Sequence, residues 1–158
     1  MSFISEVEKI EVLLSGEKAS EEDINHLVAR LPKELLTSSL ISLLQNYFLA
    51  GVCFSLDEED DESGLGADIK WFTINQMLEE ALEVYPGKSV LTLGYLPIGA
   101  CLTGSGDPYF IKVSGTNDDP PLVRIPHDLA SADEEYPESE IEVVCVSLSH
   151  FFNKAEIN

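Results

Sequence analysis

Apolar residues recur at helical spacing through the first third of the chain. The pattern predicts a helix over 3–14 that ends before Gly16, a second helix from Ser20 to Pro32, and a third over 33–46. Ser20 and Asp23 have the spacing of a capping box, in which two side chains bond the free backbone N–H groups at a helix start. We therefore expect the chain to begin with a group of helices.

The hydrophobic period changes in the second half of the chain. Thr73 and Gln76 predict one more capped helix, which runs to residue 85, and Ser147 is expected to cap a closing helix. Between these helices, short apolar runs with β-branched and aromatic residues predict strands. The expected strands between these helices cover 90–96, 109–113, 122–125 and 141–146. A further strand is expected earlier in the chain, over 48–56.

Glycine and proline mark the expected connections. Pro97, Gly99, Gly104 and Gly106 lie between two predicted strands and have the composition of turns and bulges. Residues 116–121 form a further turn, and the acidic residues 131–142 form a connector. Helices first, then a mostly antiparallel sheet with short connections, then a helix predict an α+β fold. Neither a repeat nor a linker divides the chain, so we expect one domain over 1–158.

Charge restricts the function more than length does. The 158 residues include 9 Lys and Arg against 29 Asp and Glu, which gives a formal charge of −20, yet 44% of the residues are hydrophobic. Because phosphate contacts require clustered cations, nucleic acid is not expected as a direct partner, and an anionic membrane surface is disfavoured for the same reason. The charge favours a basic protein as partner.

Six consecutive acids, 57–62, open a loop over 57–66 that is expected to be solvated. An EF-hand needs Gly at its sixth position and an acid at its twelfth. Starting at Asp57 places Glu62 sixth, and placing Gly64 sixth puts Lys70 twelfth. We therefore predict no dedicated metal site, and a loop that is either simply solvated or in contact with a basic partner.

Other chemical motifs fail on spacing. Gly104-Ser-Gly106 lacks the third glycine and the following helix of a dinucleotide loop. Cys53, Cys101 and Cys145 lie far apart in apolar segments and form no Cys-x-x-Cys pair, so neither a zinc knuckle nor a redox dithiol is indicated. Buried free thiols are expected, with a catalytic thiol or a metal ligand as the alternatives. The first residues carry acids where a signal peptide needs basic and apolar residues, which indicates a cytoplasmic protein.

His127 is the most interesting of the three histidines because it follows a predicted strand. Its neighbour Asp128 points the opposite way in an extended segment, so the two do not form a catalytic pair by sequence alone. Catalysis by His127 stays a minor alternative to a hydrogen-bonding role. We predict a protein that is not an enzyme and uses no cofactor.

The stretch GYLPIGACLTGSGDPYFI, residues 94–111, resembles the centre of the SUKH superfamily of Smi/Knr-like proteins. In that family a strand delivers an Ile-Gly pair, a glycine-rich turn follows, and the chain returns as a strand of the same sheet. Features in matching order precede and follow it, at 31–32, 71–80, 124–128 and 146–152, while 57–66 departs from a minimal member. The positions that carry the resemblance are Trp71, Pro97, Ile98, Gly99, Gly104, Gly106, Asp107 and Phe110.

Many bacterial proteins of this family are immunity proteins that bind and neutralise a toxin domain, often a nuclease, and eukaryotic members are scaffolds in cell-wall regulation. The resemblance therefore implies a module that neutralises a basic toxin domain, with a scaffold or regulatory domain as the alternative. A few desolvated aromatic anchors flanked by acids would supply the affinity. The candidate contact residues are Tyr95, Asp107, Tyr109, Asp118, Asp119, Asp128, Glu134, Glu135 and Tyr136.

Overall fold

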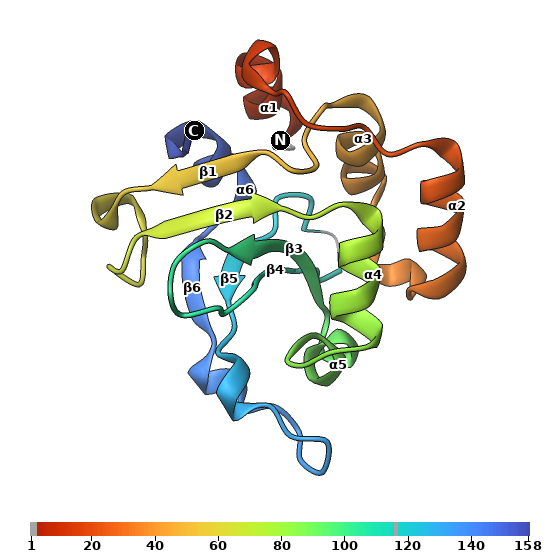
Figure 1. Ribbon diagram of the computed structural model, residues 1–158, viewed down its shortest axis with the longest axis vertical. Coiled ribbons are helices and arrows are strands. Elements are labelled where there is room, and N and C mark those ends of the chain that lie inside the picture. Colours follow the sequence, from red (N-terminus) through yellow and green to blue (C-terminus); the bar gives the residue numbers. More distant parts are fainter. Residues whose placement is uncertain (1–2, 116) are drawn as a thin grey trace.

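The computed structural model describes residues 3–115 and 117–158, and its architecture is α+β, as predicted (Figure 1). The N-terminal helices are α1 (Ile4–Ile10), α2 (Glu21–Arg30) and α3 (Ser38–Asn46), with 3-10 turns over 11–13 and 33–35. The Ser20–Asp23 capping box is present at the start of α2. Thr37 caps α3 by accepting the backbone N–H of Leu40 at 3.2 Å.

Seven antiparallel strands form one sheet in the order β6-β5-β4-β3-β2-β1-β7. Their bounds are β1 Cys53–Leu56, β2 Ala67–Trp71, β3 Tyr95–Cys101, β4 Tyr109–Lys112, β5 Leu122–Arg124, β6 Glu142–Cys145 and β7 Glu156–Ile157. Helices α4 (Ile74–Leu82) and α5 (Gly87–Val90) lie between β2 and β3, and α6 (Leu148–Lys154) follows β6. The predicted 109–113, 122–125 and 141–146 strands are therefore confirmed within a residue or two.

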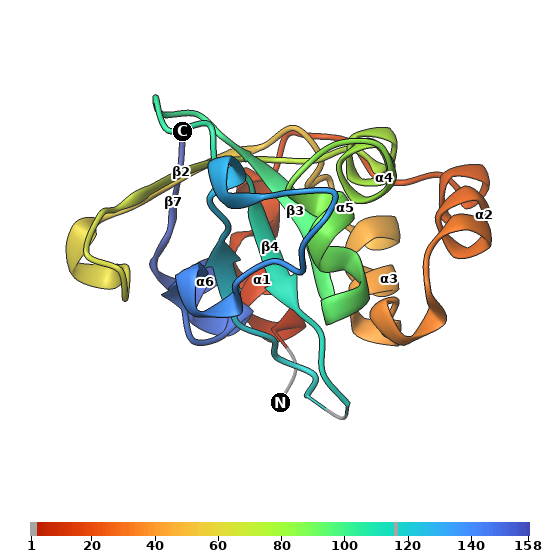
Figure 2. The same cartoon turned by 90° about the horizontal axis from the view of Figure 1, so that it is seen from below.

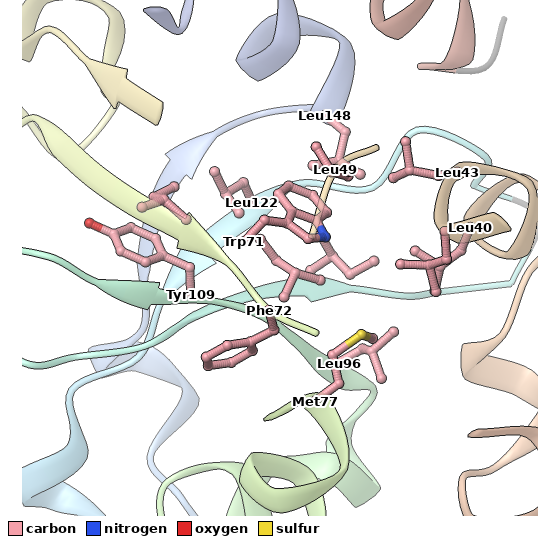
Figure 3. Close-up of a cluster of buried hydrophobic side chains, with 14 of the residues drawn as sticks. Leu40, Leu43, Leu49, Trp71, Phe72, Met77, Leu96, Tyr109, Leu122 and Leu148 are labelled. Atoms are coloured by element: carbon pink, nitrogen blue, oxygen red, sulfur yellow. The ribbon is translucent and has the colours of Figure 1, made fainter. Parts of the chain in front are cut away.

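Helices α1, α2, α3, α4 and α6 contribute side chains to the main core on one face of the sheet, part of which Figure 3 shows. Trp71 of β2 is fully buried, with its ring 5.6 Å from that of Phe152 in α6 and 6.4 Å from that of Phe54 in β1. A second apolar cluster occupies the other face of β3–β5, where Phe110 and Val123 meet Val90 and the connector that follows β5. Apolar residues on both faces fix which way each strand residue points.

The predicted strand over 90–96 is wrong. Residues 87–93 form α5 and a 3-10 turn, and Gly94 ends this helical segment with φ of 95°, a left-handed conformation that favours glycine. The strand begins only at Tyr95 and runs to Cys101, so Pro97 and Gly99 lie inside β3 and not in a turn. Pro97 pairs with Phe110 and Gly99 pairs with Tyr109, so the register shifts between them and the bulge expected from the glycine and proline residues lies inside β3.

Gly99 allows the close approach of β3 and β2. A Cβ atom at this position would lie 2.5 Å from Cγ2 of Ile69. The Ile98-Gly99 pair is thus delivered by a strand, a turn over 102–108 follows, and the chain returns as β4. The strand–turn–strand order expected at 94–111 is therefore present.

Several element boundaries differ from the sequence-based expectation. The predicted 48–56 strand is ordered as a strand only from Cys53, β2 and β7 were not predicted, and α4 ends at residue 82 instead of 85. Strand β2 alternates buried and exposed positions but is short and adjacent to glycines, so its pattern is weak. The predicted turn 116–121 begins at Thr116, which lies outside the described residues, and 117–121 lead into β5.

The acidic run 57–62 is only partly solvated, which corrects the prediction for this loop. The Asp61 side chain has no exposed surface and its Oδ2 lies 3.4 Å from Nη2 of Arg124 in β5, whose side chain is 5% exposed. The backbone N–H of Glu62 donates to Val144 O in β6 at 2.8 Å, and His150 in α6 contacts Asp60 O at 3.3 Å. The loop therefore crosses the curled sheet from the β1–β2 hairpin to its β6 edge.

We expect Asp61→Asn to lower the free energy of unfolding by about 3 kcal/mol, because it leaves a buried guanidinium without its buried counter-charge. Asp57→Asn, in the same run but exposed, is the matched control and should change it by less than about 0.5 kcal/mol. Urea unfolding at one pH measures both. Equal effects of the two variants would show that Asp61 does not hold the sheet closed.

Candidate functional site

A polar cleft of about 800 Å³ lies at one end of the sheet. One wall is the connection between β1 and β2, and the other is the connection between β3 and β4, with residues of β5 and β6 between them. Figure 2 shows the two connections, yellow and teal, in the left half of the view. The two connections thus bring side chains from distant parts of the sequence to one opening.

Carboxylates dominate the lining of this cleft. They are Asp57, Glu58, Glu59, Asp68, Asp107 and Glu142. Asp68 accepts a hydrogen bond from Ser55 Oγ at 3.0 Å, and Glu142 pairs with Arg124 at 3.2 Å. Residues 57–59 are exposed, and within the described part of the chain no cation lies within ion-pair distance of them. One wall therefore presents carboxylates that are available to a partner.

Arg124 is the single cation among the described residues that line the cleft, and its donors are already used. It bonds Gly66 O at 2.7 Å and Ser63 Oγ at 3.2 Å, and its guanidinium lies 5.2 Å from the centre of the Tyr109 ring. Burial by itself lowers the pKa of Arg124, but the hydrogen bonds and negative charges around it raise the pKa above its ordinary value. Arg124 is therefore a structural cation.

His127 forms its side-chain contact with Asp107 and not with Asp128, its neighbour in the sequence. Oδ1 of Asp107 accepts the backbone N–H of His127 at 3.0 Å and contacts its ring Nδ1 at 2.5 Å. Asp107 comes from the β3–β4 connection and His127 from a 3-10 turn that follows β5. The contact joins two loops at the wall of the cleft, so the hydrogen-bonding role expected for His127 is present.

The Cys101 thiol at the end of β3 contacts two hydroxyl groups, Thr103 Oγ1 at 2.9 Å and Ser105 Oγ at 3.2 Å. Burial raises the pKa of Cys101, but these hydroxyl groups stabilise the thiolate and the pKa falls below its ordinary value. Among the described residues, no hydrogen bond joins this thiol to His127. A nucleophile and its base are therefore not assembled here.

The three candidate aromatic anchors are buried, which corrects their expected place on the surface. Tyr109 lies in the main core, and Tyr95 and Tyr136 lie in the second cluster. Tyr95 donates to Glu138 at 2.9 Å and Tyr136 donates to Pro126 O at 2.5 Å. Burial is the main cause that raises the pKa of each phenol to about 12. Apolar strand neighbours on both faces enclose these rings, so they do not offer surface to a partner.

The candidate acids do not gather in one place. Asp107 lines the cleft, and Asp128, Glu134 and Glu135 are exposed on the connector that follows β5. Asp118 accepts from Ser39 Oγ at 2.7 Å, and Asp119 accepts from the backbone N–H of Ser149 in α6 at 2.9 Å. These two residues follow β4, whereas Asp107 precedes it, so their carboxylates stabilise the opposite end of the sheet.

The resemblance positions divide between core and turn. Trp71, Ile98 and Phe110 are fully buried, while Gly104 and Gly106 are exposed in the β3–β4 connection. Two exposed leucines beside the cleft were missed by sequence reasoning: Leu65, which lines it, and Leu102, whose backbone N–H donates to Asp68 O at 3.0 Å. An apolar residue among glycines and polar residues in a predicted loop is the signal that could have identified both.

We expect iodoacetamide at pH 7 to alkylate Cys101 at least about tenfold faster than Cys145, because the thiolate is the reacting species. Burial raises the pKa of the fully buried Cys145 thiol to about 12, whereas Cys101 is half-buried with a lowered pKa. Peptide mass spectrometry of the native protein measures both rates, with Cys101→Ala as control. Faster labelling of Cys145 would contradict the hydroxyl-stabilised thiolate.

In the part of the chain that the structure describes, no group of three or more His, Cys, Asp and Glu side chains is arranged to hold a metal ion. Nor does any helix of the described residues have the length and apolar character needed to cross a membrane. Comparison with protein-family models, with curated proteins and with solved structures finds no match to this chain.

Proposed function

We propose that this protein is a non-enzymatic binding module of the SUKH immunity type, which neutralises a basic toxin domain in the cytoplasm. The observation that carries the proposal is the cleft. Its carboxylates at 57–59 are exposed, and Arg124, the single cation among the described lining residues, uses its donors within the protein. The resemblance of 94–111 to the SUKH centre supports the immunity role, and the cleft supports the basic partner.

Electrostatics favours a cationic partner at this surface. Residues 57–59 supply three of the negative charges in the formal charge of −20, and no cation among the described residues pairs with them. A nuclease must carry cations where it holds phosphates, so an inhibitor that presents carboxylates competes for the same surface. Net charge of this size accelerates association with a basic protein by about tenfold to a thousandfold at low salt.

Charge alone does not give a tight complex, and the two exposed leucines beside the cleft supply an apolar contribution. Leu65 is 64% exposed and Leu102 is 49% exposed, although most large apolar side chains in this molecule are buried. Apolar anchors that become desolvated inside a polar rim carry most of the energy of a protein interface. We assign to Leu65 and Leu102 the role that the sequence suggested for the buried tyrosines.

The Cys101 cluster is the nearest arrangement to a catalytic centre, and its geometry supports binding over catalysis. The thiol has hydroxyl partners and no hydrogen bond to His127 within the described residues, while His127 is engaged by Asp107. A thiol enzyme needs its base within reach of the nucleophile.

Capture from the native host tests the function itself. The full chain, immobilised in low salt, should retain a basic toxin domain encoded beside its own gene, and its expression should protect cells from that domain. Retention of a resident regulatory protein instead would favour the scaffold alternative. Failure to bind or to protect against any toxin encoded nearby would overturn the immunity proposal.

The position of the interface is tested by two variants that each remove three negative charges. We expect Asp57→Asn/Glu58→Gln/Glu59→Gln to weaken the toxin complex at least about tenfold and to reduce its salt dependence. Asp133→Asn/Glu134→Gln/Glu135→Gln, on the exposed connector, should weaken it by less than about threefold. Calorimetric titration at two salt concentrations measures both, and equal losses would place the interface elsewhere.

The leucines are tested separately from the charges. Leu65→Ser/Leu102→Ser should weaken the same complex at least about tenfold while its salt dependence stays unchanged, because apolar contact is lost and charge is not. Val12→Ser/Leu13→Ser is the control, since these residues are also exposed but lie in the 3-10 turn after α1. A smaller salt dependence or an effect of the control would contradict a specific apolar contact at the cleft.

A further inference from the structure

Strands β1 and β2 carry outward side chains that belong to neither apolar cluster. Cys53 of β1 lies opposite Lys70 of β2 in the register of the sheet, and Ser55 lies opposite Asp68. Lys70 is exposed and the other three are half-buried, while the strand residues between them are buried in the main core. Figure 1 looks onto these strands with no helix in front of them, and Figure 2 shows α1 and α6 on their other side. We call residues 53, 55, 68 and 70 the open face.

The open face is continuous with the cleft. Ser55 and Asp68 line the cleft and are joined by their hydrogen bond. Leu102 lies next to Asp68, since its backbone N–H donates to Asp68 O. Lys70 follows Asp68 by two residues on the same side of β2, a step of about 7 Å along a strand. A partner seated in the cleft therefore meets the Cys53–Lys70 pair next.

A second hollow lies at the far end of the open face. Its volume is about 320 Å³, and its lining includes Lys70, Glu17, Thr73 and Gln76 together with glycines 16 and 51. Thr73 and Gln76 belong to the capped start of α4, which follows β2. Strand β2 thus connects two concave regions, the cleft at residues 67–68 and the second hollow at residue 70.

The cleft alone is small for a protein interface. A specific complex buries about 800 Å² on each partner, which is contributed by about 20–30 residues a side. Fifteen of the described residues line the cleft. The open face and the second hollow adjoin the cleft and supply further accessible surface without any change in the fold.

Lys70 interrupts the acidic character of this surface. Among the described residues no carboxylate lies within ion-pair distance of its Nζ, so Glu17, the other charged residue of the second hollow, does not neutralise it directly. Covering an ammonium group with a surface that offers no acceptor is unfavourable, and a cation placed opposite it is repelled. A partner that covers Lys70 must therefore present a carboxylate there.

We propose that the open face is part of the interface with the basic partner, and that Lys70 determines which basic protein is accepted. The partner carries cations opposite 57–59 and a carboxylate opposite Lys70. A chain with a formal charge of −20 attracts basic proteins in general, and repulsion at Lys70 rejects those that lack this carboxylate. The inference rests on the proposed function, because it assigns a further part of the interface to the same partner.

Charge reversal at Lys70 separates direct contact from long-range attraction. Lys70→Glu makes the chain more negative, so steering alone predicts equal or tighter binding of the toxin domain encoded beside the gene. We expect a loss of at least about tenfold instead, because two carboxylates then face each other. Lys33→Glu, the same charge change in the exposed 3-10 turn before α3, should alter the affinity by less than about threefold. Calorimetric titration measures both, and equal or tighter binding by Lys70→Glu would overturn the proposal.

Thiol footprinting of the native chain needs no variant. Cys53 reports the open face, and Cys101, whose hydroxyl partners Thr103 and Ser105 line the cleft, reports the cleft. The bound toxin domain should slow the alkylation of both thiols by iodoacetamide at least about fivefold, because it blocks access to them. Slowing at Cys101 alone would overturn this proposal and leave the proposed function standing. Slowing at neither thiol would overturn both.

A second copy of the chain is the competing occupant of the open face. The formal charge of −20 opposes the association of two copies. We therefore expect the alkylation rate of Cys53 in the chain alone to stay constant as the protein concentration is raised. A rate that falls with concentration would assign the open face to a contact between copies and overturn the proposal.

Discussion

The buried ion pair between Asp61 and Arg124 is the interaction on which the rest of the structure depends. It joins the β1–β2 connection to β5 and, with Gly66 O and Ser63 Oγ, uses the donors of a guanidinium that has almost no contact with water. A buried charge without its partner costs several kcal/mol, so the sheet is held in its curled form by an arrangement that tolerates little change. The cleft exists because this pair brings the acidic connection across the sheet.

The acidic run therefore has two roles that differ by position. Asp61 turns inward and is neutralised, while residues 57–59 turn outward and stay unpaired among the described residues. Unpaired carboxylates repel one another, and this repulsion destabilises the folded loop. Hydrogen bonds of the backbone on both sides of the loop can hold it in place despite the repulsion. The backbone bonds of Asp60 and Glu62 to α6 and β6 act in this way. A fixed acidic wall loses less entropy on binding than a flexible loop would.

Local signals predicted local structure well. The caps at Ser20, Thr73 and Ser147 were found from spacing alone, because each bond joins residues three positions apart. The α+β class followed from the change of hydrophobic period. The strand expected at 90–96 failed because its apolar residues fit a short helix as well as a strand, and Gly94 decided between them by ending the helical turn.

The site was harder to predict, because its contacts join residues far apart in the sequence. Asp61 and Arg124 are 63 positions apart, and nothing in a run of six acids indicates which one is buried. Tyr95, Tyr109 and Tyr136 were expected as surface anchors, but the apolar clusters on the two faces of the sheet bury them.

The most direct test of the acidic cleft as a cation-binding surface is a nitrogen-15 NMR titration of the native chain with a deca-lysine peptide. Shifts should concentrate at 57–59, 65 and 102–107; shifts spread over the connector 131–140 and the N-terminal helices would contradict a defined site.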